Sequence, residues 1–553
     1  MPQDKSASEP SSRHETPTSA DDSTDFTQRA RVNQERLASA LRPQYDFIVC
    51  GAGTTGSVVA RRLAETPEIS VLLLEAGGSD DVPSITAAAQ WPTNIGSERD
   101  WGFHGLPNPR LNGRSIPFSM GKALGGGSAI NAMAWARGHR SDWDFFASES
   151  ADPNWGYGSV LDIYRRIEDW HGAPDPVYRG SGGPVFVQPA PDPNPLAPAT
   201  VEAARSIGIP TFDHPNGAMM EGPGGASIID LRIRDGKRES IFRSYSYPYM
   251  DRPNLTVLTH AHVTKVTLEG HRATGVEFSH RGMAHAIRAS SEVVLSLGAI
   301  HTPKVLMYSG IGDSTDLREF GIPVRQHLPG VGRNFQDHVA IYCAWEYREP
   351  LPPRNNLAEA TVYWSTTSDA NRPDVLICEA EVPMATDAVS VQYELPQAGF
   401  SLAGGLAHPR SRGRLRLTGP DPHHPIQIDA NTFDDPDDMK AARACVELCR
   451  AIGNSGPLRS FVKREVFPGD LGGGDLDEFI RNAATTFWHE TGTAKMGQDP
   501  MSVVDSALQV YGIDGLRIAD GSIMPRTTTG NTMAPCVIIG ERASSIISAH
   551  HGL

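Results

Sequence analysis

The sequence predicts an α/β protein: a doubly wound, Rossmann-like domain on a parallel sheet, interrupted by an inserted α+β domain on an antiparallel sheet. Residues 45–65, "YDFIVCGAGTTGSVVARRLAE", read as a buried strand, a glycine turn and a helix. A short second strand, "ISVLLLEAGG", follows at 69–78. A similar strand, glycine turn and helix return near residues 292–312, which indicates that the chain leaves the first domain and comes back to it.

The first glycine turn has the spacing of a dinucleotide-binding loop. Gly51 permits a tight turn, Gly53 permits close approach of a pyrophosphate, and Gly56 permits close packing of helix on strand. The helix N-terminus faces the phosphates. Glu75 ends the second strand, where a carboxylate can bind ribose hydroxyls. This unit alone does not separate FAD from NAD, because both carry adenosine and pyrophosphate.

The remaining elements follow in order. Residues 254–278 alternate in polarity as strands joined by turns, while residues 412–419, "RGRLRLTG", predict a strand and residues 436–453 a helix. No fixed internal repeat is visible. We expect the nucleotide domain to comprise residues 44–165, 226–339 and 482–553, and a substrate-binding domain to comprise residues 166–225 and 340–481.

Residues 1–43 are expected to form a disordered to weakly helical extension. The first part is polar, rich in Ser, Thr and Pro, and lacks the apolar middle of a secretory signal. No apolar run approaches the roughly 18 residues of a membrane helix. These features predict a cytoplasmic protein without a membrane span.

The overall charge argues against two classes of partner. A formal net charge of −15 and a pI near 5.7 repel nucleic-acid phosphates and anionic lipid, so small molecules are the expected ligands. The six cysteines show no paired metal spacing and fit reduced thiols, with Cys445 and Cys449 as buried residues of one helix face. No metal site is predicted.

Residues 487–497, "FWHETGTAKMG", contain a single histidine, His489. A zinc-binding helix would need a second histidine four residues later, and Thr493 stands there. The neighbouring Phe487 and Trp488 are either cavity walls or ordinary core aromatics. We expect Glu490 to be a solvated or structural carboxylate, and His338, in "NFQDH", to belong to a structural polar network.

Two further segments suit a flat cofactor. Three consecutive glycines in "LGGGSAIN", residues 124–131, let the backbone lie against a ring and present its amides. Residues 518–525, "IADGSIMP", end a strand at Asp520 and Gly521, and a helical pattern follows from about residue 533.

Seven ordered motifs carry a family resemblance that runs from about residue 45 to the C-terminus. They are "GAGTTG", "LLEAGG", "GKALGGGSAINAMAWARGHRSDWD", "GAIHTPKVLMYSGIG", "GVGRNFQDH", "FWHETGTAKMG" and "LRIADGSIMPRTTTGNTMAPCVIIGERA". The sequence resembles the glucose-methanol-choline (GMC) oxidoreductases, flavoenzymes that oxidise alcohols. The resemblance implies FAD rather than NAD as the cofactor.

The resemblance also implies which residues contact FAD. Asp520 is placed at the phosphate and ribitol side, and Val263 at the adenine edge. Some relatives bind flavin covalently through a histidine, but the matching position here is Ile130, so we expect dissociable FAD. The full predicted set is Gly51, Gly53, Thr54, Thr55, Gly56, Glu75, Ala76, Gly121, Leu124, Gly125, Gly126, Gly127, Ser128, Asn131, Ala132, Met133, Ala134, Val263, Gly298, Trp488, Asp520, Gly521, Asn531, Thr532 and Met533.

For catalysis, the resemblance implies that His489 is the acid/base and that Asn531 hydrogen-bonds the substrate oxygen. An amide can donate to a developing alkoxide but cannot take its proton, which leaves His489 as the base. This pairing is similar to the choline oxidase and hydroxymethylfurfural oxidase branches of the family. The expected reaction converts an alcohol, expected to be primary, to an aldehyde.

Several alternatives stay open at this point. The electron acceptor could be oxygen or a quinone-type carrier, and the protein could be a monomer or a homodimer. Some family members are hydroxynitrile lyases that use the histidine for acid/base cleavage, and a non-catalytic flavin-binding protein is a third possibility.

Overall fold

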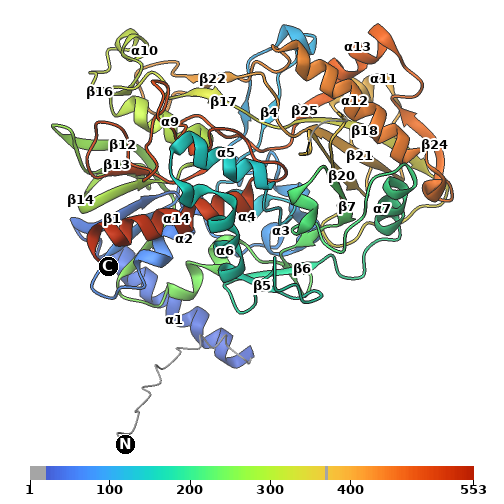
Figure 1. Cartoon of the computed structure of the whole chain (residues 1–553). Coiled ribbons are helices and arrows are strands. Elements are labelled where there is room, and N and C mark those ends of the chain that lie inside the picture. Colours follow the sequence, from blue (N-terminus) through green and yellow to red (C-terminus); the bar gives the residue numbers. More distant parts are fainter. Residues whose placement is uncertain (1–19, 368–370) are drawn as a thin grey trace, which may run out of the picture.

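The computed structural model describes residues 20–367 and 371–553. The predicted disordered tail at residues 1–19 lies outside the described residues. Figure 1 shows two sheets side by side: the strands of the first lie between residues 44 and 295 and at 516–518, and those of the second lie mainly between residues 339 and 486. Among the described residues, no helix is both long and apolar enough to cross a membrane.

The first sheet has seven strands in the order β11-β2-β1-β14-β13-β12, with β26 also paired to β14. Their bounds are β1 Gln44–Cys50, β2 Val71–Leu74, β11 Leu255–Leu258, β12 Ala261–Glu269, β13 Arg272–His280, β14 Met283–Leu295 and β26 Leu516–Ile518. Strands β11, β2, β1, β14 and β26 run parallel, while β12, β13 and the first half of β14 form an antiparallel meander. The predicted doubly wound fold is confirmed.

Helices α2 (Thr54–Leu63), α9 (Gly298–Tyr308) and α14 (Met533–His551) accompany this sheet. Helices α2 and α14 pack closely because Gly540 presents no side chain: a Cβ there would lie 2.7 Å from the Cβ of Val58. This contact joins the first glycine turn to the last helix of the chain, although nearly 500 residues separate them.

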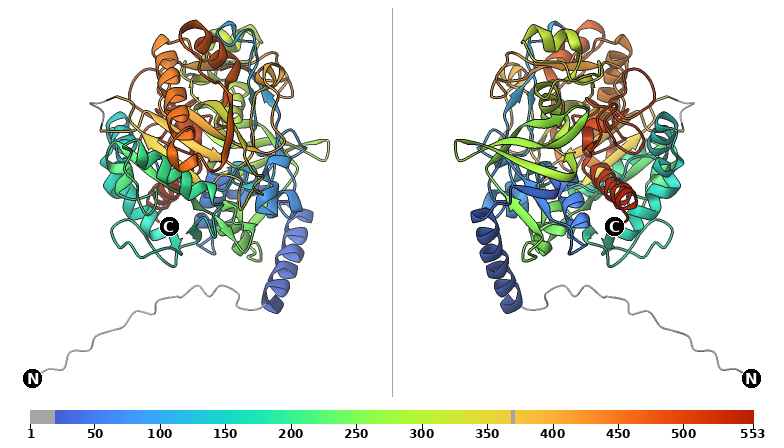
Figure 2. Two further views of the ribbon diagram at one scale, coloured as in Figure 1. Left: turned by 90° about the vertical axis from the view of Figure 1, so that its right-hand side faces the viewer. Right: turned by 90° about the vertical axis from the view of Figure 1, so that its left-hand side faces the viewer.

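The N-terminal extension contains a full helix, α1 (Ala20–Ser39), where a weakly helical stretch was expected. Gln34 of this helix is buried and donates from Nε2 to the Leu255 carbonyl oxygen, while its Oε1 accepts from the Val257 backbone N–H. Hydrogen bonding to β11 therefore holds a helix that local sequence favours only weakly. Figure 2 shows α1 at the edge of the molecule.

The second sheet is antiparallel and also has seven strands, in the order β24-β18-β21-β20-β19-β7, with β25 paired to β18. Their bounds are β7 Gly224–Ile228, β18 Val339–Tyr347, β19 Ala360–Trp364, β20 Val375–Ala380, β21 Gly399–Leu406, β24 Val462–Phe467 and β25 Ala484–Thr486. The expected boundary at residue 225 therefore falls inside β7, and the one at residue 481 falls before β25.

Helix α12 (Pro436–Gly453) covers one face of this sheet and has the bounds that the sequence predicts. Cys445 and Cys449 are fully buried on it, and their sulfur atoms lie against Gly404 of β21, where a Cβ would be 2.7 Å from each. The predicted strand at 412–419 is observed as β22 (Gly413–Arg416). It forms a separate three-stranded sheet with β17 (Arg333–Phe335) and β23 (Gln427–Asp429).

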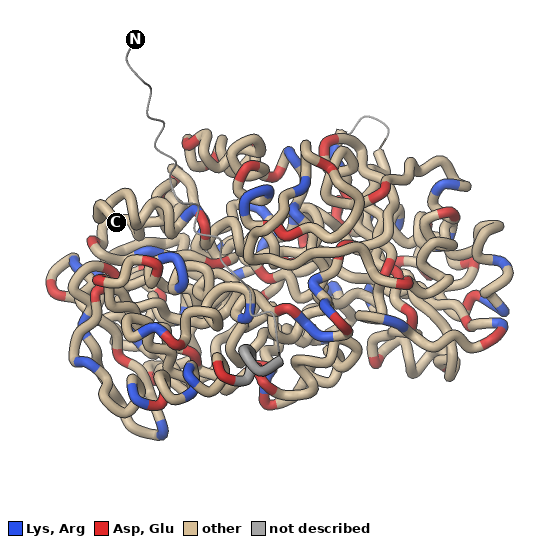
Figure 3. Tube along the Cα trace, turned by 90° about the horizontal axis from the view of Figure 1, so that it is seen from below, with Lys and Arg blue, Asp and Glu red and all other residues tan. Residues whose placement is uncertain are grey.

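Charged residues are mixed over the described chain. Figure 3 shows Lys and Arg interspersed with Asp and Glu. In the described part, one group of metal-capable side chains occurs: Glu292, His550 and His551. Glu292 there is paired with Arg517 at 2.6 Å and with His551 at 3.0 Å.

Candidate active site

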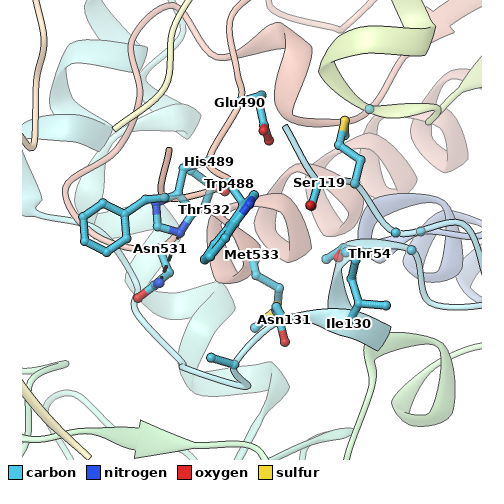
Figure 4. Close-up of a pocket in the computed structure, with 18 of the residues that line it drawn as sticks. Thr54, Ser119, Ile130, Asn131, Trp488, His489, Glu490, Asn531, Thr532 and Met533 are labelled. Carbon is cyan, nitrogen blue, oxygen red and sulfur yellow. Dashed lines mark hydrogen bonds between the residues drawn. The ribbon is translucent and has the colours of Figure 1, made fainter. Parts of the chain in front are cut away.

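A cavity of about 410 Å³ lies between the two sheets. Its first half is lined by the glycine turns of the nucleotide domain, and its second half by the antiparallel sheet and by the segment around His489. Figure 4 shows His489 and Asn531 together, with Thr54, Ile130 and Asn131 across the cavity. The segments that the sequence singles out for the cofactor and for catalysis thus share one cavity.

The first glycine turn has the geometry expected of it. Gly51 has φ +99°, and a Cβ at this position would lie 2.3 Å from the Ser296 carbonyl oxygen. A Cβ on Gly56 would lie 1.9 Å from the Gly51 carbonyl oxygen, so only glycine allows α2 to begin this close to β1. Gly126 of the second glycine segment approaches Gly53, where its Cβ would lie 2.7 Å from the Gly53 Cα.

Glu75 is held at the end of β2 by backbone donors. Its carboxylate accepts from the Ala52 N–H at 3.0 Å and from the Gly77 N–H at 2.8 Å. Burial raises the pKa of Glu75 to about 7, although these backbone hydrogen bonds oppose that shift. The carboxyl group therefore lines the cavity at the position expected for ribose recognition.

Asp520 organises the opposite wall after β26. One oxygen accepts from the Gly298 N–H at 2.9 Å and from the Thr302 hydroxyl at 2.6 Å, while the other accepts from the Ser522 N–H at 2.8 Å. These contacts join the start of α9 to the loop before α14. Asp520 therefore fixes the wall in addition to lining the cavity.

Most of the predicted cofactor residues line this cavity. They are Gly51, Gly53, Thr54, Thr55, Glu75, Ala76, Gly121, Gly126, Gly127, Asn131, Ala132, Ala134, Val263, Gly298, Trp488, Asp520, Gly521, Asn531, Thr532 and Met533. Gly56, Leu124, Gly125, Ser128 and Met133 do not line it. Gly56 serves the close packing described above, and the Ser128 hydroxyl accepts from the Ile241 N–H and donates to the Gly125 carbonyl oxygen.

His489 lies buried at the centre of the second half. Its Nε2 is 3.1 Å from the Asn531 amide nitrogen, and its Nδ1 is 2.9 Å from Nδ1 of His338. An amide nitrogen can only donate, so Nε2 accepts; Nδ1 then carries the proton and donates to His338. Burial lowers the pKa of His489 well below 6.5, which keeps the ring neutral near pH 7.

His338 has a closer relation to the site than the sequence suggests, because it contacts His489 directly. Both histidines are buried, with ring centroids 5.0 Å apart at 87°. Asp337 accepts from the His489 backbone N–H at 2.9 Å. Burial lowers the pKa of His338 to about 4, so it is neutral as well. The available signal was two adjacent polar residues, "DH", immediately before an apolar strand pattern.

Glu490 is buried in the cavity wall, so of the two expected roles the solvated carboxylate is excluded and the structural one is left. Its Oε1 has no hydrogen-bond partner among the described residues. Burial and the nearby Asp337 raise the pKa of Glu490 well above its usual range. This shift favours the protonated form of the carboxyl group, which can donate one hydrogen bond into the cavity.

The aromatic residues before His489 both line the cavity. Phe487 stacks on the His489 ring, with centroids 5.7 Å apart and planes 3° from parallel. Trp488 has φ +59°, a left-handed conformation that large side chains rarely adopt. Its backbone N–H donates to the Thr486 hydroxyl at 2.6 Å. Such a strained residue beside the histidine is typical of a functional site.

Asn531 is positioned by a buried network under the loop before α14. Asp142 is fully buried; it accepts from the Thr529 N–H and pairs with Arg526 at 3.2 Å. Gly530 has φ +85°, and a Cβ there would lie 2.8 Å from the Tyr363 hydroxyl. These contacts fix the turn that presents Asn531 to His489.

Buried polar atoms without hydrogen-bond partners also indicate that the cavity binds a large polar cofactor. The side-chain oxygens of Ser296, Glu490 and Asn531 are buried in its wall and have no hydrogen-bond partner among the described residues. Buried polar atoms are rarely left unpaired, so these three indicate a polar ligand. The glycine contacts supply the close backbone approach that a pyrophosphate and a flat ring need.

The sequence matches two GMC oxidoreductase family models, at residues 45–340 and 409–540. An oxygen-dependent choline dehydrogenase from Sinorhizobium medicae is 35% identical, covering 91% of this chain and 95% of its own. An alcohol dehydrogenase [acceptor] from Pseudomonas putida is also 35% identical, with the same coverage.

Solved structures agree with these matches. The pyridoxine 4-oxidase from Mesorbium loti is 32% identical with a TM-score of 0.87, covering 92% of this chain and 99% of its own. A fungal aryl-alcohol oxidase at 23% identity shares the fold, with a TM-score of 0.80 and coverage of 93% and 100%. The chain therefore belongs to the GMC oxidoreductase family, whose members use FAD to oxidise alcohols.

Proposed function

We propose that His489 is the base that takes the hydroxyl proton of the alcohol. The supporting observation is a neutral, buried imidazole whose Nε2 lone pair faces the cavity beside Asn531. Bound FAD would supply the hydride acceptor for the alcohol carbon. Because proton removal makes departure of the hydride easier, a positioned base typically contributes about 10²–10⁴-fold in rate.

Asn531 is proposed to hold the substrate oxygen. Its amide nitrogen already points at His489 Nε2, and a hydroxyl placed between the two groups could donate to Nε2 while it accepts from the amide. The same amide then stabilises the negative charge that develops on that oxygen. The Asn531 amide donor and the His489 Nε2 acceptor therefore face the same position, where the substrate oxygen would lie.

His338 is a positioning residue in this proposal. It accepts from Nδ1 of His489, which leaves the lone pair on Nε2, the atom that faces the substrate. After proton transfer, the same hydrogen bond stabilises the charged His489 ring.

An anaerobic mixing experiment tests the redox function. The purified protein with FAD is mixed with neutral, aromatic and aminated alcohols, and flavin bleaching at about 450 nm is followed before air is admitted. Bleaching by an alcohol is expected. Rapid return of colour in air would identify oxygen as the acceptor, and slow return a quinone-type carrier. Absence of bleaching across the panel would contradict the proposal and favour the lyase alternative.

We also propose that FAD is dissociable. Ile130 lines the cavity at the position where some relatives carry the linking histidine, and its side chain cannot form that bond. Acid precipitation should release all the flavin into the supernatant; flavin left on the precipitated chain would contradict this. A cytoplasmic location and a monomer or homodimer remain predictions from the sequence.

A further inference from the structure

We infer that the substrate is an uncharged alcohol carrying an aromatic or branched apolar group, rather than a quaternary ammonium alcohol such as choline. This inference rests on the proposed function and concerns the second half of the cavity. It follows from which side chains of the antiparallel sheet face His489, and from where the carboxyl groups of the cavity point.

The sheet wall of the cavity is apolar or neutral. Tyr342 of β18 and Cys378 of β20 are both paired with Ala403 of β21, and all three line the cavity. Gly405 lies two residues after Ala403 on β21, and a Cβ there would lie 2.3 Å from the Phe487 ring. The Phe487 ring in turn stacks on His489. The face of Tyr342, Cys378 and Ala403 is therefore the wall next to the base.

The polar groups of this wall carry no charge. Burial raises the pKa of Cys378 to about 12, and the pKa of Tyr342 is also raised, so both keep their protons at neutral pH. The wall thus offers a hydroxyl and a thiol, which suit neutral oxygen atoms and ring edges.

Glu379 follows Cys378 on β20, but strand alternation turns its carboxyl group to the other face of the sheet. Leu402, its partner on β21, alternates with Ala403 in the same way. There the Glu379 carboxylate accepts from the Glu359 N–H at 3.1 Å and interacts with Tyr347. Burial raises the pKa of Glu379 to about 8, so the group is mostly protonated at pH 7. Its carboxyl group points away from the cavity face of Cys378, although the residue lies in the cavity wall.

The other carboxyl groups of the cavity are also unavailable to a substrate beside Asn531. Glu75 and Asp520 are bound to backbone donors in the cofactor half. Figure 4 places Glu490 and Asn531 on opposite sides of His489. A cation in the second half would lose its hydration without gaining a counter-ion, which is strongly unfavourable.

Aromatic rings could offer a partial substitute through cation–π attraction. However, the Trp91 and Trp488 rings pack edge to face, with centroids 6.4 Å apart at 74°, and Phe487 is stacked on His489. These rings pack on one another and on the base. The arrangement fits a flat or branched apolar group better than a caged ammonium.

The test compares choline with 3,3-dimethylbutan-1-ol, which has the same shape with carbon in place of the charged nitrogen. Stopped-flow reduction of the FAD-loaded protein at pH 8 should give a second-order rate constant at least ~10²-fold higher for the neutral alcohol, the scale expected for burying an unpaired charge. Benzyl alcohol should also reduce the flavin. Equal or faster reduction by choline would overturn the inference and leave the proposed function intact. Absence of reduction by every alcohol would instead contradict the proposed function.

A matched pair of variants tests the wall itself. Cys378→Asp places a carboxylate on the cavity face, while Cys378→Ser keeps it neutral at similar size. The ratio of choline to 3,3-dimethylbutan-1-ol rates should rise at least ~10-fold in Cys378→Asp and stay unchanged in Cys378→Ser. Because both alcohols are measured on the same protein, a fall in overall activity does not affect the ratio. An unchanged ratio in Cys378→Asp would contradict the assignment of this wall to the substrate.

Discussion

The two halves of the cavity are built by different means. The cofactor half consists of glycines and backbone amides, with Glu75 and Asp520 tied to those amides. The substrate half consists of side chains from the antiparallel sheet and from the segments that carry His489 and Asn531. In the first half, shape depends on the absence of Cβ atoms; in the second, it depends on which side chains are present.

This difference predicts how each half responds to substitution. A methyl group added to a glycine whose Cβ would meet backbone, as at Gly51 and Gly56, should prevent FAD binding, because those backbone atoms cannot move aside. A change in the substrate half should leave FAD bound and alter the rate or the choice of alcohol.

Gly56→Ala should abolish FAD binding. The added Cβ would lie 1.9 Å from the Gly51 carbonyl oxygen, so α2 must move away from β1. The ratio of absorbance at about 450 nm to that at 280 nm in the purified protein measures its FAD content. In this variant the ratio should fall to that of protein without FAD. Gly158→Ala is the control, because the Cβ there meets no atom within 4 Å. Full FAD content in Gly56→Ala would contradict the account of this turn.

Asn531→Ala should keep FAD but slow flavin reduction by roughly 10²-fold, the scale of one lost oxyanion donor. Asn531→His keeps a hydrogen-bond donor and should recover most of the rate. Rapid-mixing measurements on both variants, with cofactor content checked first, decide the point. Equal rates for the two variants would show that donation is not what Asn531 provides.

His338→Gln should slow reduction by roughly tenfold, the scale of one hydrogen bond to a charged ring. Because His338 is neutral above about pH 4, its effect in this range is the hydrogen bond that stabilises the charged His489 ring, so its removal should move the acid limb of the rate profile to lower pH. A purely structural role would lower the rate without moving that limb. The profile of reduction rate between pH 5 and 9 separates the two cases.

The wild-type protein should show little change in reduction rate from pH 8 down to pH 6.5. His489 acts in its neutral form, and its lowered pKa means that protonation begins only well below 6.5. The rate should therefore fall at more acidic pH, where the base becomes protonated. A midpoint at or above pH 6.5 would show that burial does not hold His489 neutral.

The cofactor half was largely predictable from sequence because its signals are local. The glycine spacing from Gly51 to Gly56, the strand ending at Glu75 and the segment ending at Gly521 each need only a few neighbouring residues. The family resemblance added FAD and paired His489 with Asn531. Gly56, Leu124, Gly125, Ser128 and Met133 lie near these motifs but not in the cavity wall, since motif membership does not specify which way a residue points.

The substrate half was not predictable in the same way. Tyr342, Cys378 and Ala403 come from three strands, and only their register places them on one face. The contact between His338 and His489 joins residues 151 apart. The burial of Glu490 likewise depends on packing around the cavity. No local pattern encodes these relations, because they arise from tertiary pairing.

We propose that His489 removes the hydroxyl proton and that bound FAD would supply the hydride acceptor. The most direct measurement compares anaerobic flavin reduction by one alcohol in the wild-type protein and in His489→Ala, after confirming equal FAD content. The account predicts that His489→Ala keeps its FAD, is still reduced by dithionite, and is reduced by the alcohol at least ~10²-fold more slowly. Near-normal reduction of His489→Ala by the alcohol would contradict it.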